Sequence, residues 1–203
     1  ANGTFFSPTS RYAEDGVAYT YDPEGARALL AEAGYPDGFD APFWYQAQPP
    51  YSDMGPAIIE DLAQIGIRAQ AEAKIYDQFV QETNPGPPAV IIFAWEDAYG
   101  HGSYIADAGF RSGAIADGCC NYPHISDPRV DELAVLGHDS DQAVSDQAYR
   151  DLARLVVREI VGWVPLIYPV RSDLANDAVK NFATAVYPSG QSKRFDEYWI
   201  DRS

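Results

Sequence analysis

The chain has 203 residues, of which 46% are hydrophobic and 22% charged, and its formal net charge is −16 at pH 7. This composition is typical of one globular domain, or of one domain with an appendage, and excludes a disordered chain. The acidic balance argues against nucleic acid and anionic lipid as partners, and no apolar run approaches the ~20 residues of a membrane-spanning helix.

The first half of the chain alternates strand and helix patterns. Asp22 as a cap, Pro23 in the first turn and Gly34 at the end predict a helix between them. Further patterns predict strands over 42–48 and 67–74, and helices over 54–66 and about 76–83. A nearly continuous apolar run over 89–95 predicts a fully buried strand, as in parallel sheets. This rhythm favours an α/β fold.

The second half is predicted to be mainly helical, with an extended tail. A short helix is expected over 102–109, and Asp127 followed by Pro128 repeats the earlier helix start. Further along, we expect a long helix over 141–161, an edge or crossover strand over 163–172, and an extended ribbon over 179–203. In that ribbon Phe195, Tyr198 and Trp199 would form an exposed apolar patch if nothing covered them.

Chemically versatile side chains gather in FAWEDAYGHGSY, residues 93–104, directly after the buried strand. Ligand sites of α/β folds lie beyond the carboxyl ends of strands. Aromatic faces there suit rings, and the acids and the histidine can select polar groups. The alternative stays open that Trp95 packs in the core and the acids are solvated. We expect a ligand site lined by Trp95, Asp97, Tyr99 and His101, with Tyr45, Gln46 and Gln48 from a neighbouring strand end.

The sequence offers little support for catalysis or for a cofactor. Ser103 lies near His101 but has no G-x-S-x-G turn around it, and the adjacent Glu96 and Asp97 are badly placed for two opposed carboxylates. There is no dinucleotide-binding or phosphate-binding loop. We therefore expect no catalytic residues, no cofactor and no enzyme activity.

The cysteines and histidines do not form a metal-binding pattern. Cys119 and Cys120, the only cysteines, are adjacent, and the three histidines are scattered. The two cysteines are either small buried thiols or a strained vicinal disulfide. A disulfide would imply an oxidising compartment.

Several segments carry a family resemblance in their order and spacing. They are YDPEGARALLAEAGYPDGF, IIEDLAQIGI, FAW, NYPHISDPRVDELA and YRDLARLVVREIVGWVPLIYP, which span about residues 20–170. Together they resemble the peptide/nickel/opine class of ABC-transporter solute-binding proteins, that is, bacterial extracellular solute-binding protein family 5, cluster C.

The resemblance implies a lobe of the type II periplasmic-binding fold, with a mixed, mostly parallel sheet flanked by helices. Residues 1–175 would form the second lobe, and residues 176–203 a return segment toward a missing N-terminal lobe. The implied partners are a small-molecule solute, that lobe and an ABC permease. The implied location is periplasmic or extracellular, either free or anchored through a removed N-terminal segment. The alternative is a sensor or interaction module built on the same lobe, without transport.

The resemblance also bears on the solute. Peptide binders of this class carry an Asp three residues after the strand-ending Trp, and here that position is Ala98, with Asp97 one residue early. Dipeptide binders use an Arg before the second helix, whereas the loop over 45–53 contains none. A buried zwitterion needs both charges paired. We therefore expect a sugar, an oligopeptide-like compound or a related polar solute rather than a dipeptide, and a nickel chelate stays open.

Overall fold

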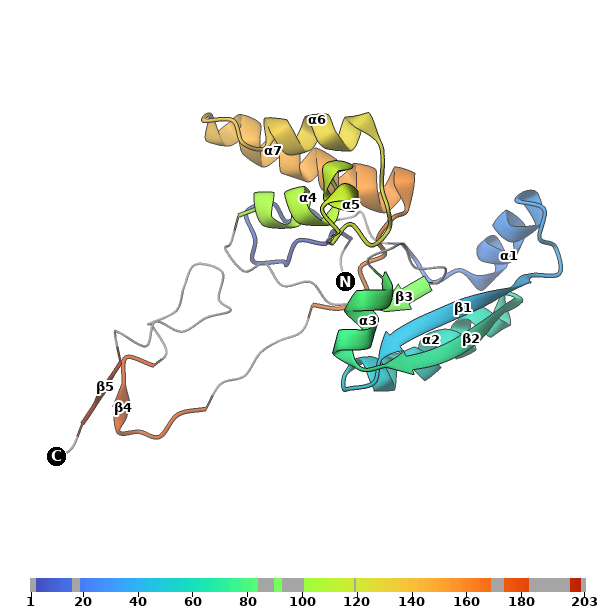
Figure 1. Cartoon of the computed structure of the whole chain (residues 1–203), viewed down its shortest axis with the longest axis horizontal. Coiled ribbons are helices and arrows are strands. Elements are labelled where there is room, and N and C mark those ends of the chain that lie inside the picture. The colour runs from blue at the N-terminus through green and yellow to red at the C-terminus, as the bar shows by residue number, and fades with distance from the viewer. Residues whose placement is uncertain are drawn as a thin grey trace. The chain divides into compact units, whose positions relative to one another are not determined.

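The computed structural model describes residues 3–15, 19–83, 90–92, 101–118, 120–168, 174–182 and 198–201. The chain divides into two compact units, which it enters alternately (Figure 1). The first unit comprises Ala1–Ala18, Trp95–Ala114 and Ile125–Ser203, and the second comprises Tyr19–Ala94 and Ile115–His124. In the described part of the chain, no helix is long and apolar enough to cross a membrane. The expected division at residue 175 stays a prediction.

A three-stranded parallel sheet forms the centre of the second unit. Its strands are β1 (Phe39–Gln46), β2 (Ile67–Lys74) and β3 (Val90–Ile92), in the order β2-β1-β3. The helices of this unit are α1 (Pro23–Glu32), α2 (Tyr51–Gln64) and α3 (Tyr76–Thr83). The strand–helix alternation and the parallel pairing confirm the α/β prediction (Figure 1).

Local sequence signals explain where these elements begin. The side chain of Asp22 accepts a hydrogen bond of 2.8 Å from the N–H of Gly25, which caps α1 as predicted. β1 begins at Phe39 rather than at the predicted Pro42, because Phe39 already pairs with Ile67 at the start of β2. α2 likewise begins at Tyr51, one turn before the predicted start.

The two faces of this sheet differ in chemistry. Parallel partners share a face and successive residues alternate, so Phe43 and Tyr45 lie on the face toward α2, where the Tyr45 ring contacts Gly55. The opposite face, hereafter the polar face, carries Trp44 and the charged side chains of both strands. These charged side chains are Asp40, Arg68, Glu72 and Lys74. Of the two faces, α2 therefore meets the more apolar one.

The first unit is mainly helical. Its helices are α4 (Ser103–Gly109), α6 (Pro128–Leu136), α7 (Gln142–Arg154) and the π-helix η1 (Leu155–Ile160), while α5 (Gly113–Ala116) is shared between the units along the chain. A short antiparallel pair joins β4 (Val179–Lys180) to β5 (Trp199–Ile200). The fully buried core of this unit includes Tyr12, Phe110, Val130, Tyr149, Leu152 and Val156.

The second half of the chain follows the predictions only in part. Asp127 caps α6, accepting from the N–H of Arg129 at 2.9 Å, as the Asp-Pro pair predicts. The long helix predicted over 141–161 changes at Leu155 into a π-helix. The strand predicted over 163–172 is wrong for 163–168, which form no strand, and 169–173 lie outside the described residues. Pro165 lacks a backbone donor, and alternating apolar residues alone do not supply a pairing partner.

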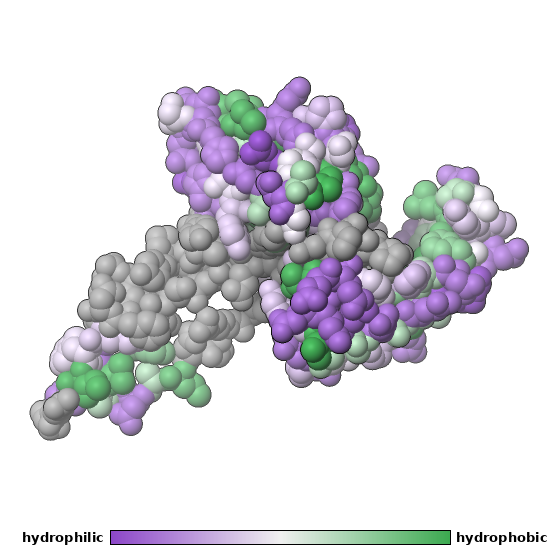
Figure 2. Space-filling model, in the orientation of Figure 1, coloured by the Kyte–Doolittle hydropathy of each residue, from purple (hydrophilic) through white to green (hydrophobic). Residues whose placement is uncertain are grey.

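Apolar side chains also remain on the surface of both units. Leu29 on α1 is 66% exposed, and Ile200 on β5 is 61% exposed. Figure 2 shows hydrophobic surface at both elements, and hydrophilic surface over α3. None of the residues of α1 is buried in the described structure.

Alkaline pH is expected to destabilise the first unit through Tyr149. Burial, helped by the carboxylate of Asp107, raises the pKa of Tyr149 to about 12. An unfolded tyrosine titrates near ~10, so the full contribution is present below that pH and is lost as the pH rises toward 12. Urea unfolding between pH 9 and pH 12 should show this fall, on the order of 2 to 3 kcal/mol. Tyr149→Phe should flatten the dependence, and an unchanged slope would contradict the assignment.

Candidate functional site

The predicted ligand residues fall into three groups. Trp95, Asp97 and Tyr99 lie outside the described residues. His101 belongs to the first unit. The remaining three, Tyr45, Gln46 and Gln48, belong to the second unit, where β1 ends. The geometry available for a site is therefore that of the carboxyl edge of the sheet, by which we mean the ends of β1 and β2 and the turn after β1.

Gln46 and Gln48 form an amide pair at this edge. Gln46, the last residue of β1, is buried, and its Oε1 accepts a hydrogen bond of 3.1 Å from Nε2 of Gln48. Between them, the N–H of Ala47 donates to the carbonyl oxygen of Lys74 at 2.8 Å. An amide presents both donors and acceptors, so a pair held in this way can recognise polar groups without carrying charge.

Tyr45 has a packing role in the described structure. A Cβ added at Gly55 would lie 2.8 Å from Cδ1 of Tyr45, so the ring lies directly against the backbone of α2. Because side chains alternate along a strand, this ring and Gln46 lie on opposite faces of the sheet. A ligand role for Tyr45 stays a prediction.

His101 stands at the start of α4. Its Nδ1 accepts from the N–H of Ser103 at 3.2 Å and lies 2.9 Å from Oγ of the same residue. Its ring meets those of Tyr12 and Tyr149 edge-on, at centroid distances of 6.3 and 5.5 Å. These contacts assign His101 a part in capping and packing, and its role toward a ligand stays a prediction.

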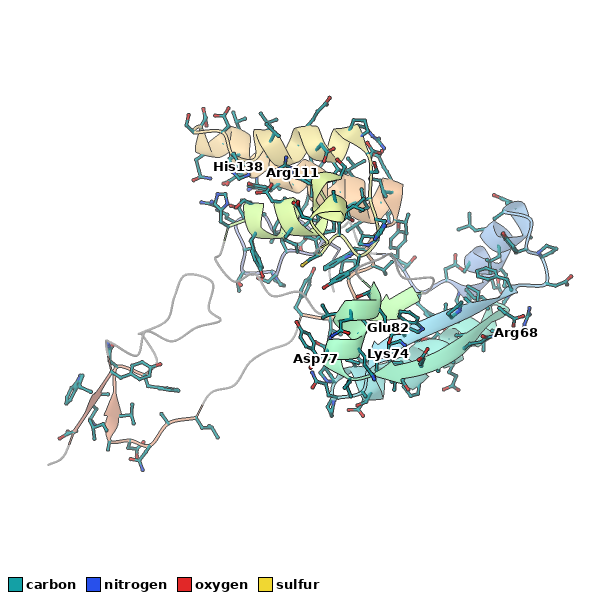
Figure 3. The ribbon with its side chains drawn as sticks, in the orientation of Figure 1. Arg68, Lys74, Asp77, Glu82, Arg111 and His138 are labelled. Atoms are coloured by element: carbon teal, nitrogen blue, oxygen red, sulfur yellow. The ribbon has the colours of Figure 1, made fainter. Side chains whose placement is uncertain are left out.

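A charged cluster at the carboxyl edge escaped the sequence-based prediction. Nζ of Lys74 lies 2.6 Å from Oε1 of Glu72, 2.7 Å from Oε2 of Glu82 and 4.1 Å from the centroid of the Trp44 ring. Lys74 and Glu82 are labelled in Figure 3. The side chain of Lys74 is only 5% exposed. Burial alone would lower the pKa of Lys74, but the hydrogen bonds to Glu72 and Glu82 outweigh it, so the pKa lies above its ordinary value.

One signal for this cluster was present in the sequence. Glu72 and Lys74 are two residues apart in a predicted strand, so they share a face. The contributions of Trp44 and Glu82 depend on strand register and on the placement of α3, which the sequence alone does not reveal.

The metal and disulfide predictions concern other parts of the chain. Within the described ranges, no group of three His, Cys, Asp or Glu side chains is arranged to hold a metal ion. Cys120 is disulfide-bonded. Cys119 lies outside the described residues, so its pairing with Cys120 stays a prediction.

Comparisons with known proteins place these features in context. Residues 1–117 match the family model described as "Bacterial extracellular solute-binding proteins, family 5 Middle". Heme-binding protein A of Haemophilus influenzae is 26% identical over 176 residues, which cover 83% of this chain and 31% of that protein. The probable di/tripeptide-binding protein 5 of Pseudomonas aeruginosa is 24% identical over 187 residues, which cover 90% and 35%. The chain thus spans about a third of the length of these relatives, both of which are named as binding proteins.

The fold is also found in solved structures. One is the ABC transporter-associated periplasmic binding protein DppA from Helicobacter pylori, in complex with the peptide STSA. The match has a TM-score of 0.76 at 23% identity and covers 98% of this chain and 39% of that one. This likeness confirms the type II periplasmic-binding fold.

Proposed function

Because the chain belongs to the bacterial extracellular solute-binding proteins of family 5, we propose that it supplies a solute-binding lobe to an ABC importer. The observation that carries this proposal is the Gln46–Gln48 amide pair at the carboxyl edge of a parallel sheet. Ligands of open α/β sheets bind at that edge, and neutral amides suit a polar solute.

The proposed mechanism is binding followed by closure, without chemical conversion of the solute. A second, N-terminal lobe would cover the solute, and the closed form would deliver it to a membrane permease. The length of the relatives supports a partner lobe, because the chain spans only about a third of each. The location that fits this role is periplasmic or extracellular, with the protein either free or anchored to the membrane.

The proposed solute is a polar organic compound of peptide-like or sugar-like character. The relatives named above are described as binding heme, di- or tripeptides and the peptide STSA. Peptides and related compounds are therefore the first class to test. Ala98, and the absence of arginine from 45–53, argue against a free dipeptide, whose two charges would both need partners.

A binding titration tests this proposal. The chain, alone and joined to any N-terminal lobe encoded with it, is titrated with Ser-Thr-Ser-Ala, a tripeptide, heme and a hexose while its melting temperature is followed. At least one organic solute should raise the melting temperature in a saturable manner, because a ligand that binds only the folded state stabilises it. No shift with any of these solutes would contradict the proposal.

A matched pair of glutamines locates the binding in the same experiment. Gln48→Ala removes one polar partner and should weaken the affinity about 5- to 10-fold, which corresponds to roughly one hydrogen bond. Gln70→Ala changes an exposed glutamine in the middle of β2 and should leave the affinity unchanged. Equal effects of Gln48→Ala and Gln70→Ala would place the solute elsewhere. If the chain bound a soluble protein and none of the solutes, a sensor or docking module would be favoured instead.

A further inference from the structure

Lys74 connects the turn after β1 with α3, two segments of the second unit that lie apart in the sequence. We propose that Lys74 is a positioning residue for solute binding, and that it fixes the turn carrying Gln46 and Gln48 relative to α3. This proposal rests on the solute-binding function proposed above. It assigns Lys74 no contact with the solute itself.

The main chain of Lys74 holds the turn. Lys74 is the register partner of Gln46 in the parallel pair of β1 and β2. Its carbonyl oxygen accepts the 2.8 Å hydrogen bond from the N–H of Ala47, the residue between the two glutamines. The amide–amide hydrogen bond from Gln48 to Gln46 closes over the same turn at 3.1 Å. The main chain at Lys74 therefore holds the turn between the two glutamines.

The side chain of Lys74 holds the end of α3. Nζ donates to Glu82, the residue before the last of α3, at 2.7 Å, and to Glu72 of β2 at 2.6 Å. Phe79 of the same helix is fully buried. Figure 3 shows Lys74 and Glu82 together where β2 meets α3. One residue thus links strand, turn and helix.

The environment of Nζ makes this link stronger than an ordinary surface ion pair. Exposed ion pairs contribute little, because both charges keep their water. The Lys74 side chain is 5% exposed, and its ammonium has exchanged water for two carboxylates and the face of the Trp44 indole. Glu72 and Glu82 remain 57% and 47% exposed. The arrangement is therefore centred on a buried cation, and its outer partners reach solvent.

Loss of the cation should move α3 and not only weaken the unit. Glu72 and Glu82 both lie within hydrogen-bond distance of the same nitrogen, so without it two like charges face each other. Their repulsion acts between β2 and α3, which are the elements that Lys74 joins. Arg68 offers a matched comparison on the same polar face. It pairs with Asp40 at 2.8 Å, but both side chains are more than half exposed, and the pair links only neighbouring strands.

Hydrogen exchange and solute affinity together test the proposal in Lys74→Met, Lys74→Arg and Arg68→Met. Lys74→Met keeps the apolar stem of the side chain and removes the ammonium group. We expect amide exchange in Tyr76–Thr83 to become about 10-fold faster. The affinity for whichever of Ser-Thr-Ser-Ala, the tripeptide, heme and the hexose binds most tightly should fall about 10-fold, because the two glutamines would no longer be held in place. Lys74→Arg should recover most of both properties, and Arg68→Met should change neither.

Chemical rescue separates positioning from general stabilisation. In Lys74→Ala, added n-propylammonium can replace the missing part of the side chain and should restore both exchange protection and affinity, whereas Lys74→Met leaves no space for it. The proposal is overturned if Lys74→Met lowers the melting temperature while exchange in α3 and affinity stay as in the wild type. It is also overturned if Arg68→Met has the same effects. If the wild type binds none of Ser-Thr-Ser-Ala, the tripeptide, heme and the hexose, the solute-binding proposal fails, and exchange in α3 with its rescue still decides the role of Lys74.

Discussion

Replacing Gly38 by alanine is expected to destabilise the second unit by about 2 to 5 kcal/mol, the sum of backbone strain and steric overlap. Gly38 has φ = +70°, a conformation that L-residues rarely adopt. A Cβ at this position would also overlap the main-chain carbonyl group of Gly66. Gly38 and Gly66 immediately precede β1 and β2, so relief of the overlap would disturb the Phe39–Ile67 register.

Gly34→Ala provides the control for this effect. Gly34 has φ = +91°, but no atom lies within 4 Å of the position of its Cβ. Its substitution should therefore cost only the left-handed strain, about 1 to 2 kcal/mol. Urea unfolding of both variants measures the difference in the free energy of unfolding. Equal losses in Gly38→Ala and Gly34→Ala would show that the turn at Gly38 does not approach Gly66 as described.

Leu152→Ala is expected to destabilise the first unit by about 2 to 5 kcal/mol. Leu152 is fully buried on α7 and belongs to the main hydrophobic cluster with Tyr12, Phe110 and Val130. Truncation removes apolar contacts and leaves a cavity, because the surrounding helices can relax only in part.

Leu136→Ala applies the same change where the side chain is not buried. Leu136 is the last residue of α6 and is 44% exposed. Its truncation should cost less than about 1 kcal/mol, since surface substitutions rarely cost more. Thermal unfolding of the two variants tests this contrast. A loss at Leu136 as large as that at Leu152 would mean that the helices of the first unit pack differently.

Local signals predicted the helices and strands best. The Asp-Pro pairs at Asp22 and Asp127 cap α1 and α6 as expected, and β2 and α3 have the predicted bounds. These signals work because a cap or an alternating strand is decided by neighbouring residues. The π-helix and the missing strand at 163–168 depend on tertiary pairing and packing, for which the sequence offers no local marker.

The candidate site was less accessible to prediction. Choosing residues from strand ends identified Gln46 and Gln48, which the structure does bring together. It also chose Tyr45, which packs on α2, and His101, whose Nδ1 is engaged at the start of α4. Lys74 was overlooked, because a buried lysine becomes plausible only once Trp44, Glu72 and Glu82 are known to surround it.

Hydrogen exchange with and without a bound solute tests the central claim most directly. The wild-type chain, with its N-terminal lobe where one is encoded, is compared in the presence and absence of whichever solute among Ser-Thr-Ser-Ala, the tripeptide, heme and the hexose binds most tightly. A solute held at the carboxyl edge should slow exchange in residues 44–50, and over 93–104 if the predicted loop lines the site. It should leave α6 and α7 unchanged. Protection confined to α6 and α7, or none at saturating solute, would contradict a solute site at this edge.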